Sequence, residues 1–117
     1  MHIRKEVVMQ ISADMLRGHT ETMILRFLLE KDSYGYEINK NIRMLSNNQY
    51  ELNEATLYTA FKRLEKNGYI TSYWGNEEKG ARRKYYSITS DGKKNYQERI
   101  DEWVDTSKLI NNLLGIK

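Results

Sequence analysis

The chain has 117 residues, of which 39% are hydrophobic and 30% charged, a balance typical of one folded domain rather than a disordered segment. Its net charge of +3 is too small to indicate a nucleic-acid partner by itself, so the distribution of the charges has to be considered. With two histidines and no cysteine, the chain lacks the ligands of a metal sensor, and we expect no metal, no cofactor and no disulfide. No apolar run approaches the roughly 18 residues of a membrane span, so a cytoplasmic location away from membranes is expected.

The first predicted helix runs from Asp14 to Glu30, with His19 on its surface. Helical spacing gives this helix two apolar faces. One face carries Leu16, Met23, Ile24, Phe27 and Leu28, and the other carries Met15, Leu25 and Leu29 with Thr22 among them. A helix that packs only on its own domain needs a single apolar stripe, so we expect a second molecule to cover the other face.

Two shorter helices are predicted next, joined by a short polar link. The first opens at 34–36 and ends near Leu45, where Ser, Asn and Asn follow. The second begins after Asn53, a favourable N-cap, and stops at Asn67-Gly68. Together they predict a helix-turn-helix.

The second of these helices has one apolar and one polar face. Leu57, Phe61 and Leu64 follow at i, i+4 and i+7 and are expected to face the core. The opposite face carries Ala55, Thr59, Lys62, Arg63 and Lys66. Such a face suits the major groove of B-DNA, where base edges offer a distinguishable pattern of donors and acceptors.

A two-stranded hairpin is predicted after the helices. Residues 69–74 and 84–89 alternate and are rich in β-forming side chains, while Gly75 to Arg83 form a polar loop. Lys79, Arg82, Arg83 and Lys84 lie within six residues. Solvated surface would explain this basic cluster alone equally well, but a basic helix followed by a basic hairpin favours a winged helix-turn-helix that binds DNA.

The last predicted helix is capped by Thr89 or Ser90 and ends near Leu114, before Gly115. An apolar stripe with heptad-like spacing follows it, consisting of Tyr96, Ile100, Trp103, Ser107, Ile110 and Leu114. Little domain core remains for this helix, so a partner subunit is the simplest cover. The predicted fold is α+β and mostly α, with a DNA-binding domain over 1–89 and a C-terminal dimerisation helix over 90–117.

The candidate DNA contacts follow from the exposed helix face and the hairpin. Ala55 and Thr59 offer small contacts to base edges, and Arg63 can reach guanine or phosphate. Tyr58 can contact phosphate or pack beside Phe61, and Tyr36 can bind the DNA backbone or lie in the core. The full set is Tyr36, Ala55, Thr56, Tyr58, Thr59, Lys62, Arg63, Lys79, Gly80, Arg82, Arg83 and Lys84.

Three stretches together resemble the PadR family of winged-helix transcriptional regulators. They are the YGYEI that starts the helix at Tyr34, the TLY of 56–58 with FKRLE at 61–65 and Gly68, and the ARRKYYSIT of 81–89. The order and spacing of the three are more specific than any one of them. The resemblance implies a repressor that binds a pseudo-palindromic operator in double-stranded DNA as a homodimer joined through its first and last helices.

Within the family, the single C-terminal helix resembles a small subgroup, and most closely its multidrug-binding repressors of efflux transporters. That likeness implies a pore between subunits in which paired Trp103 side chains bind a planar aromatic small molecule. The matching pore positions are Met15, Thr22, Leu25, Tyr96, Arg99, Ile100, Trp103 and Ser107. Ser107 replaces an acidic residue of those relatives, so a preference for cationic drugs is not expected unless Asp14, Glu21 or Glu102 supplies the negative charge instead.

Two other functions remain open at this point. Trp103 on an apolar stripe is also typical of a sealed dimer core, which would leave a repressor without a small-molecule effector. The long last helix would also suit an adaptor that binds another protein. An enzyme is not expected, because the sequence shows no nucleophile–base set and no glycine loop that could hold a phosphate.

Overall fold

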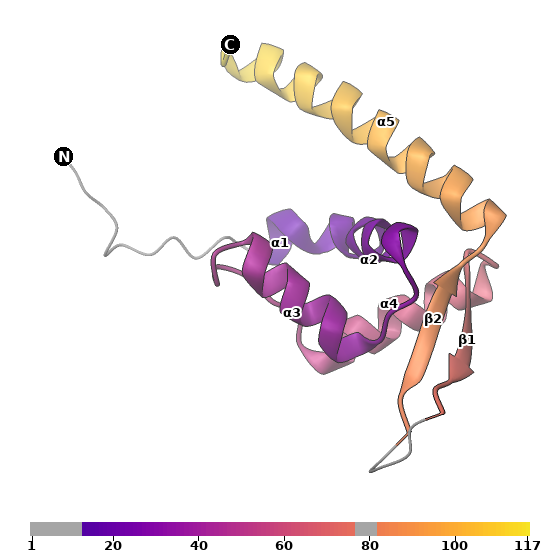
Figure 1. The fold of residues 1–117 in the computed structure, drawn as a ribbon. Coiled ribbons are helices and arrows are strands. Elements are labelled where there is room, and N and C mark those ends of the chain that lie inside the picture. Colours follow the sequence, from indigo (N-terminus) through magenta and orange to yellow (C-terminus); the bar gives the residue numbers. More distant parts are fainter. Residues whose placement is uncertain (1–12, 77–81) are drawn as a thin grey trace.

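The computed structural model describes residues 13–76 and 82–117 of the chain. Its elements are α1 (Ala13–Leu16), the 3-10 helix η1 (Arg17–His19), α2 (Thr20–Glu30), α3 (Gly35–Leu45), α4 (Glu54–Lys66), β1 (Ile70–Trp74), β2 (Lys84–Ile88) and α5 (Ser90–Leu114). Figure 1 shows α1 to α4 gathered beside the two strands, with α5 extending from them as a long arm. The arrangement confirms the predicted α+β class.

The core lies where α2, α3, α4 and the hairpin meet. Ile24, Ile38 and Leu64 have no exposed surface, and Phe61 is 1% exposed. Phe61 also stacks on Tyr86 of β2, with ring centroids 3.9 Å apart, which joins α4 to the sheet. Leu57, Phe61 and Leu64 therefore face the core as predicted, and the opposite face of α4 is left to solvent.

The two strands pair antiparallel, from Ile70 opposite Ile88 to Trp74 opposite Lys84. A third segment joins them, because Ser33 and Tyr86 exchange backbone hydrogen bonds of 3.2 and 2.8 Å. The link before α3 is thus fixed to the base of the wing. A one-residue bridge has no sequence periodicity, so the sequence offered no sign of it.

The prediction of one continuous helix from Asp14 to Glu30 is wrong. The chain forms α1, tightens into η1 at Arg17–His19, and only then enters α2. Glycine costs about 1 kcal/mol relative to alanine inside a helix, so Gly18 makes the continuous helix less favourable at this point.

The predicted second apolar face of the first helix is also partly wrong. Leu25 has no exposed surface and lies among the core residues, so it does not belong to an outer face. Met15 and Leu29 are 75% and 41% exposed, as an outer face requires. Leu25 lies three residues before Leu28 within α2, so the two side chains share one side of the helix and are buried together.

The helix ends follow the predicted capping residues. The Asn53 side chain accepts a hydrogen bond of 2.8 Å from the Thr56 N–H, and the Thr89 hydroxyl accepts one of 3.0 Å from the Gly92 N–H. Gly115 ends α5 in the left-handed region at φ 74°. Both N-caps lie next to functional elements, since one starts α4 and the other turns the chain from the wing into α5.

Helix α5 packs on the domain through its first half, as far as Trp103, which contacts His19. Gly92 is buried and Tyr96 packs against the core, whereas Trp103, Ile110 and Leu114 are 47%, 42% and 68% exposed. Figure 1 shows the C-terminal part extending free of the other elements. Within 13–76 and 82–117, none of the helices has the length and apolar character needed to cross a membrane.

Candidate nucleic-acid interface

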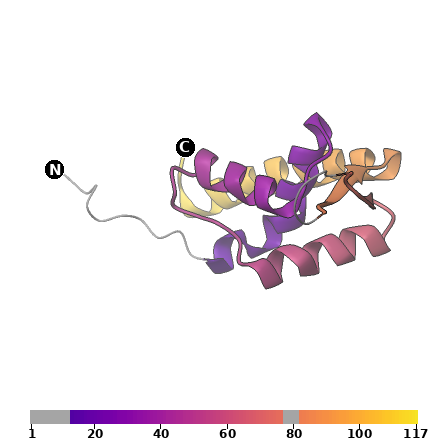
Figure 2. The same ribbon diagram turned by 60° about the horizontal axis from the view of Figure 1, so that its bottom comes forward.

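The exposed face of α4 lies along one edge of the molecule (Figure 2). Ala55, Thr59 and Lys62 are all exposed on it, and Thr56 is exposed beside them. None of these side chains covers the core, so the face combines a small apolar group, hydroxyls and a cation over more than two helical turns. These groups are suited to bases and phosphates in a groove.

Lys66 belongs to the same face but was left out of the predicted contacts. It is exposed at the last turn of α4, four residues after Lys62. Helical spacing of four from Lys62 was enough to identify it.

The two tyrosines with open alternatives are both largely exposed. Tyr36 on α3 is 65% exposed, with the Arg43 guanidinium 5.9 Å from its ring centroid, so it is not a core residue. Tyr58 on α4 is 46% exposed and touches Phe61 edge-on at a centroid distance of 5.7 Å. One side of Tyr58 therefore packs on the domain while the other remains available to a partner.

The basic residues of the wing lie over aromatic rings. The Arg82 guanidinium lies 5.6 Å from the Trp74 ring centroid, and that of Arg83 lies 4.7 Å from Tyr34. The Lys84 ammonium lies 6.0 Å from the Trp74 ring. These contacts hold the stems of the cations near the domain and leave all three residues exposed. Lys79 and Gly80 of the predicted set lie outside the described residues.

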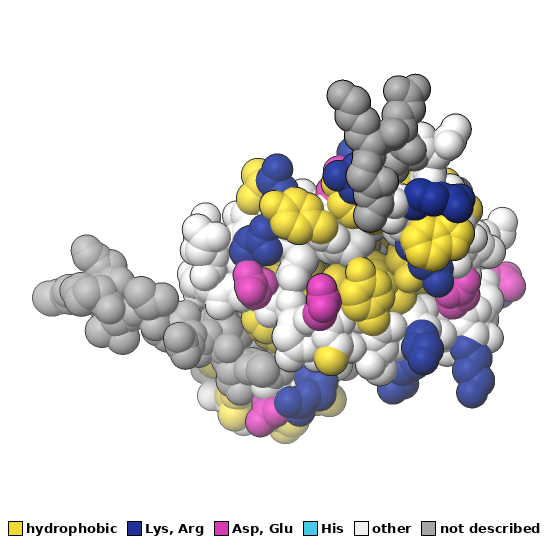
Figure 3. All heavy atoms as spheres, turned by 90° about the horizontal axis from the view of Figure 1, so that it is seen from below, with side chains coloured by type: hydrophobic (Ala, Val, Ile, Leu, Met, Phe, Trp, Pro, Cys, Tyr) yellow, Lys and Arg dark blue, Asp and Glu magenta, His cyan; other side chains and the backbone are white. Residues whose placement is uncertain are grey.

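The wing is also fixed to the link before α3 by a side-chain contact. Tyr73 of β1 donates a hydrogen bond of 2.6 Å to the Asp32 carboxylate. This hydrogen bond raises the pKa of Tyr73. Figure 3 shows the face that contains the wing, with Lys and Arg side chains spread over it and Asp and Glu side chains among them.

Arg63 is paired with an acidic side chain of another helix. Its Nε lies 3.1 Å from Oε2 of Glu21 on α2, although its side chain is 71% exposed. The other carboxylate oxygen of Glu21 accepts a hydrogen bond of 2.8 Å from Nη2 of Arg99 on α5. From the sequence, Glu21 was considered only as a possible acidic group for a ligand, and no local pattern could have indicated these two ion pairs, because the partners lie on distant elements.

Five of the eight predicted ligand residues line two cavities beside α5. The cavity at Trp103 has a volume of about 420 Å³, and Thr22 and Arg99 line it too. Trp103 meets His19 there, edge to face, with ring centroids 4.8 Å apart. His19 was expected on a plain helix surface, so this contact is a second feature that the sequence did not indicate.

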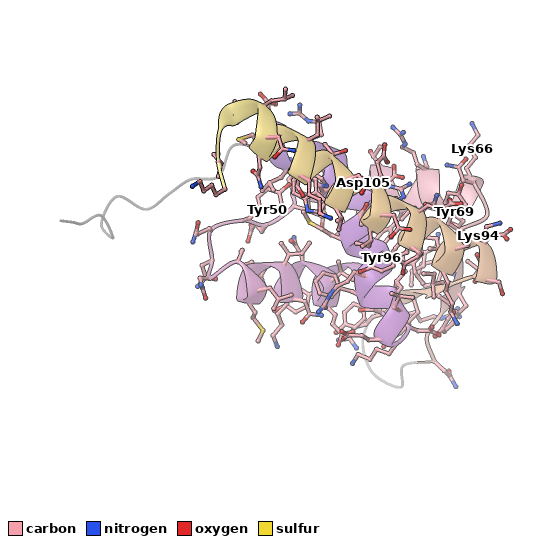
Figure 4. The ribbon with its side chains drawn as sticks, turned by 90° about the horizontal axis from the view of Figure 1, so that it is seen from above. Tyr50, Lys66, Tyr69, Lys94, Tyr96 and Asp105 are labelled. Carbon is pink, nitrogen blue, oxygen red and sulfur yellow. The ribbon has the colours of Figure 1, made fainter. Side chains whose placement is uncertain are left out.

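The other cavity lies between α5, α2 and the end of α3, and has a volume of about 580 Å³. Tyr96, Ile100 and Thr22 line it together with Tyr50 from the link before α4. Figure 4 shows this region from the α5 side, with Tyr50 and Tyr96 labelled. Most of its exposed lining is apolar, which is typical of pockets for small organic molecules.

Three predicted ligand residues line neither of these two cavities. Met15 is 75% exposed, and Leu25 is buried in the core. The Ser107 hydroxyl donates to the Val104 carbonyl of its own helix at 2.9 Å. Among the described residues, there is also no group of three or more His, Asp or Glu side chains placed to hold a metal ion.

Comparison with known proteins identifies relatives with the same fold. The model of the PadR-like family of transcriptional regulators matches residues 24–98. A Lysinibacillus sphaericus protein, named uncharacterized protein X, is 46% identical over 101 residues, which are 86% of this chain and 93% of that protein.

Two solved structures are similar over nearly their whole length. A transcriptional regulator from Clostridium thermocellum, Cth-833, has 54% sequence identity and a TM-score of 0.81, over 87% of this chain and 96% of that one. A PadR family transcription regulator from Clostridium difficile R20291 has 40% identity and a TM-score of 0.72, over 83% and 99% of the two chains. The chain therefore belongs to the PadR family of transcriptional regulators, which are DNA-binding proteins and not enzymes.

Proposed function

We propose that this regulator is a homodimeric repressor that binds a pseudo-palindromic operator and releases it when a planar aromatic or lipophilic compound binds between the subunits at Trp103. In this proposal α4 and the wing read DNA, α5 is the dimerisation helix, and the protein acts in the cytoplasm, where the DNA is. A role in drug or stress response follows from the class of compound.

The exposed face of α4 supports the DNA-reading part of the proposal. Its side chains are small, hydroxyl-bearing or basic, and the basic wing lies beside it. Two copies related by a two-fold axis would present two such helices to successive major grooves, about one helical turn of DNA apart.

The exposure of Trp103 is the single observation that carries the effector part. The residue is 47% exposed, borders a cavity of about 420 Å³ and meets His19 at an interplanar angle of 77°. Its exposed surface can take a flat ligand, and stacking is worth about 0.5–1.5 kcal/mol beyond area burial. Stacking depends little on the identity of the ring, which supports broad specificity.

The DNA part is tested by a gel shift with the fragment upstream of the protein's own gene and a scrambled fragment of equal length. We expect tighter binding to the upstream fragment, with an affinity that falls steeply with salt. Binding that is weak and equal for both fragments would instead support a protein-binding adaptor.

The effector part is tested by Trp103 fluorescence in a Trp74→Phe background, titrated with phenazine as an uncharged flat compound. We expect saturable quenching that Trp103→Ala abolishes. Because the linkage is reciprocal, phenazine must bind more weakly when the upstream fragment is present. Quenching that does not saturate, or that DNA does not weaken, contradicts the effector.

A repressor without an effector is the second candidate, and two contacts favour it. The Ser107 hydroxyl donates its hydrogen bond within its own helix, and Arg99 is bound to Glu21 and to the Asn95 side chain. Fewer polar groups are then free for a ligand than the sequence suggested. In that case the dimer seals around Trp103, and phenazine has no effect on its fluorescence or on DNA binding.

A further inference from the structure

One carboxylate connects the DNA-reading helix to the last helix. Glu21 on α2 binds Arg63 of α4 through Oε2 at 3.1 Å and Arg99 of α5 through Oε1 at 2.8 Å. Arg99 is held on its own helix as well, since its Nε donates to the Asn95 side chain. Three elements that are far apart in the sequence thus meet at one acidic side chain.

The three side chains differ in how much of their surface is exposed to solvent. The side chains of Glu21 and Arg99 are 16% and 24% exposed, whereas that of Arg63 is 71% exposed. The inner pair is therefore shielded from solvent, and only Arg63 extends outward. Exposed ion pairs contribute about 0–1 kcal/mol to stability, so holding Arg63 in place is a better explanation of its contact than stabilising the fold.

The atom that Arg63 uses also matters. Its contact with Glu21 is made through Nε, which leaves the terminal Nη groups of the guanidinium for a second partner. A planar guanidinium that is fixed on one side can approach a phosphate or the O6/N7 edge of guanine with two parallel hydrogen bonds. A mobile arginine has to lose more side-chain entropy to reach the same geometry.

We propose that Glu21 is a positioning residue that orients Arg63 for DNA, and that Arg99 makes this orientation depend on the position of α5. The inference rests on the proposed role of α4 as the DNA reader. It adds a physical connection between the subunit contact and DNA specificity. When α5 shifts, Arg99 moves with it and displaces the Glu21 carboxylate that holds Arg63.

Arg99 also connects this ion pair with Trp103. It lines the cavity of about 420 Å³ that Trp103 borders, and it lines a second cavity of about 600 Å³ that reaches Arg63 and Thr59 on α4. A compound bound at Trp103 would therefore lie against a side chain that is hydrogen-bonded to Glu21. From Arg99 the route to α4 is two contacts long, from Arg99 to Glu21 and from Glu21 to Arg63.

The test compares the wild type with Glu21→Gln, which keeps the size of the side chain and removes its charge. The measured quantity is the ratio of the dissociation constants for a scrambled fragment and for the upstream fragment. We expect this ratio to fall about 3- to 10-fold, in the range of coupling between contacting residues. Binding to the scrambled fragment should stay equal or become tighter, because a negative charge near DNA is lost.

The control is Glu54→Gln, which removes a negative charge from the exposed first turn of α4. It should change both dissociation constants by the same factor and leave their ratio unaltered. If Glu21→Gln behaves in the same way, Glu21 acts only through its charge and the proposal is overturned.

Two further variants test the remaining contacts. Arg63→Lys keeps the charge but loses Nε, so it should lower the ratio, and the effect should not add to that of Glu21→Gln. If Glu21→Gln does not fold, as judged by thermal unfolding, Glu21→Asp replaces it, because the shorter side chain keeps the charge but moves the carboxylate away from Arg63 and should also lower the ratio. Arg99→Gln should lower the ratio as well, and a wild-type ratio in this variant would refute the connection to α5.

The same measurements separate this inference from the proposed function. A wild-type protein with no preference for the upstream fragment contradicts the proposed function itself. A clear wild-type preference that survives Glu21→Gln and Arg63→Lys contradicts only the positioning role.

Discussion

Gly92 fixes the start of α5 against the base of the wing. A Cβ atom added at this position would lie 2.1 Å from the Tyr69 carbonyl oxygen and 2.7 Å from the Ile88 side chain. The oxygen belongs to the backbone and cannot move aside cheaply. We expect Gly92→Ala to lower the free energy of unfolding by about 1–3 kcal/mol, as overpacking usually does, measured by urea denaturation.

Gly18 provides the matched control for this substitution. A Cβ atom there would meet nothing within 4 Å, and the residue lies in the 3-10 turn of η1. Gly18→Ala should leave stability unchanged or slightly higher. Equal denaturation midpoints for Gly92→Ala and the wild type would show that α5 can shift away from Tyr69 without cost.

Because of Tyr86, the free energy of unfolding should decrease as the pH rises into the alkaline range. Burial raises the pKa of Tyr86 to about 12 from its ordinary value of 10. The unfolded chain therefore loses this proton at lower pH than the folded protein, and the contribution of the neutral phenol is lost between about pH 10 and 12. Tyr86→Phe has no such proton, so its stability should fall less over this pH range.

The measurement is the denaturation midpoint at a series of pH values from 8 upward. Tyr36→Phe serves as the control, because this ring is 65% exposed and lies away from the core. Parallel pH profiles for Tyr86→Phe and the wild type would mean that the buried phenol has no influence on alkaline unfolding.

At the scale of elements, the stability of the DNA-reading helix α4 depends on its N-cap residue, Asn53. Asn53 accepts the hydrogen bond of the Thr56 N–H at 2.8 Å, and Thr56 is itself a predicted DNA contact. Asn53→Ala should lower the free energy of unfolding by about 1 kcal/mol, the usual loss for a removed N-cap. Thermal unfolding measures the change.

Asn53→Asp is the informative companion, because an aspartate oxygen accepts the same hydrogen bond and its charge suits a helix N-terminus. It should retain wild-type stability, or exceed it. Equal loss in both variants would mean that Asn53 matters for a reason other than capping.

Local sequence patterns predicted the elements well where the residues of the pattern themselves make the interaction that forms the element. Asn53, Thr89 and Gly115 mark helix ends because each supplies a hydrogen bond or a backbone angle that the end requires. The spacing of Leu57, Phe61 and Leu64 predicted the buried face of α4 for the same reason.

The errors occurred where the structure depends on contacts between distant segments. The 3-10 turn η1 divides the predicted first helix, and the core formed with α3, α4 and the hairpin buries Leu25, which was assigned to an outer face. The bridge from Ser33 to Tyr86 and the ion pairs of Glu21 join segments that periodicity treats as independent. For the site, helical spacing predicted the exposed face of α4, but it could not predict that Arg63 pairs with Glu21.

At the scale of the whole molecule, the outer part of α5 is an arm without cover in the protomer. Trp103, Ile110 and Leu114 lie on one stripe, and all are exposed by 42% or more. An apolar stripe of this kind usually marks an interface, and PadR regulators act as dimers.

We therefore expect a particle of twice the 13.9 kDa chain mass at micromolar concentration, measured by sedimentation equilibrium. Ile110→Asp places a charge on the stripe and should weaken the dimer by about 2–3 kcal/mol, or roughly 30- to 150-fold in dissociation constant. Asn112→Asp adds the same charge on the opposite side of α5 and should leave the dimer intact.

Since two α4 helices must bind together to recognise a paired site, Ile110→Asp should also lose operator preference while still binding any DNA weakly. Unchanged sedimentation of Ile110→Asp would exclude the stripe as the subunit contact.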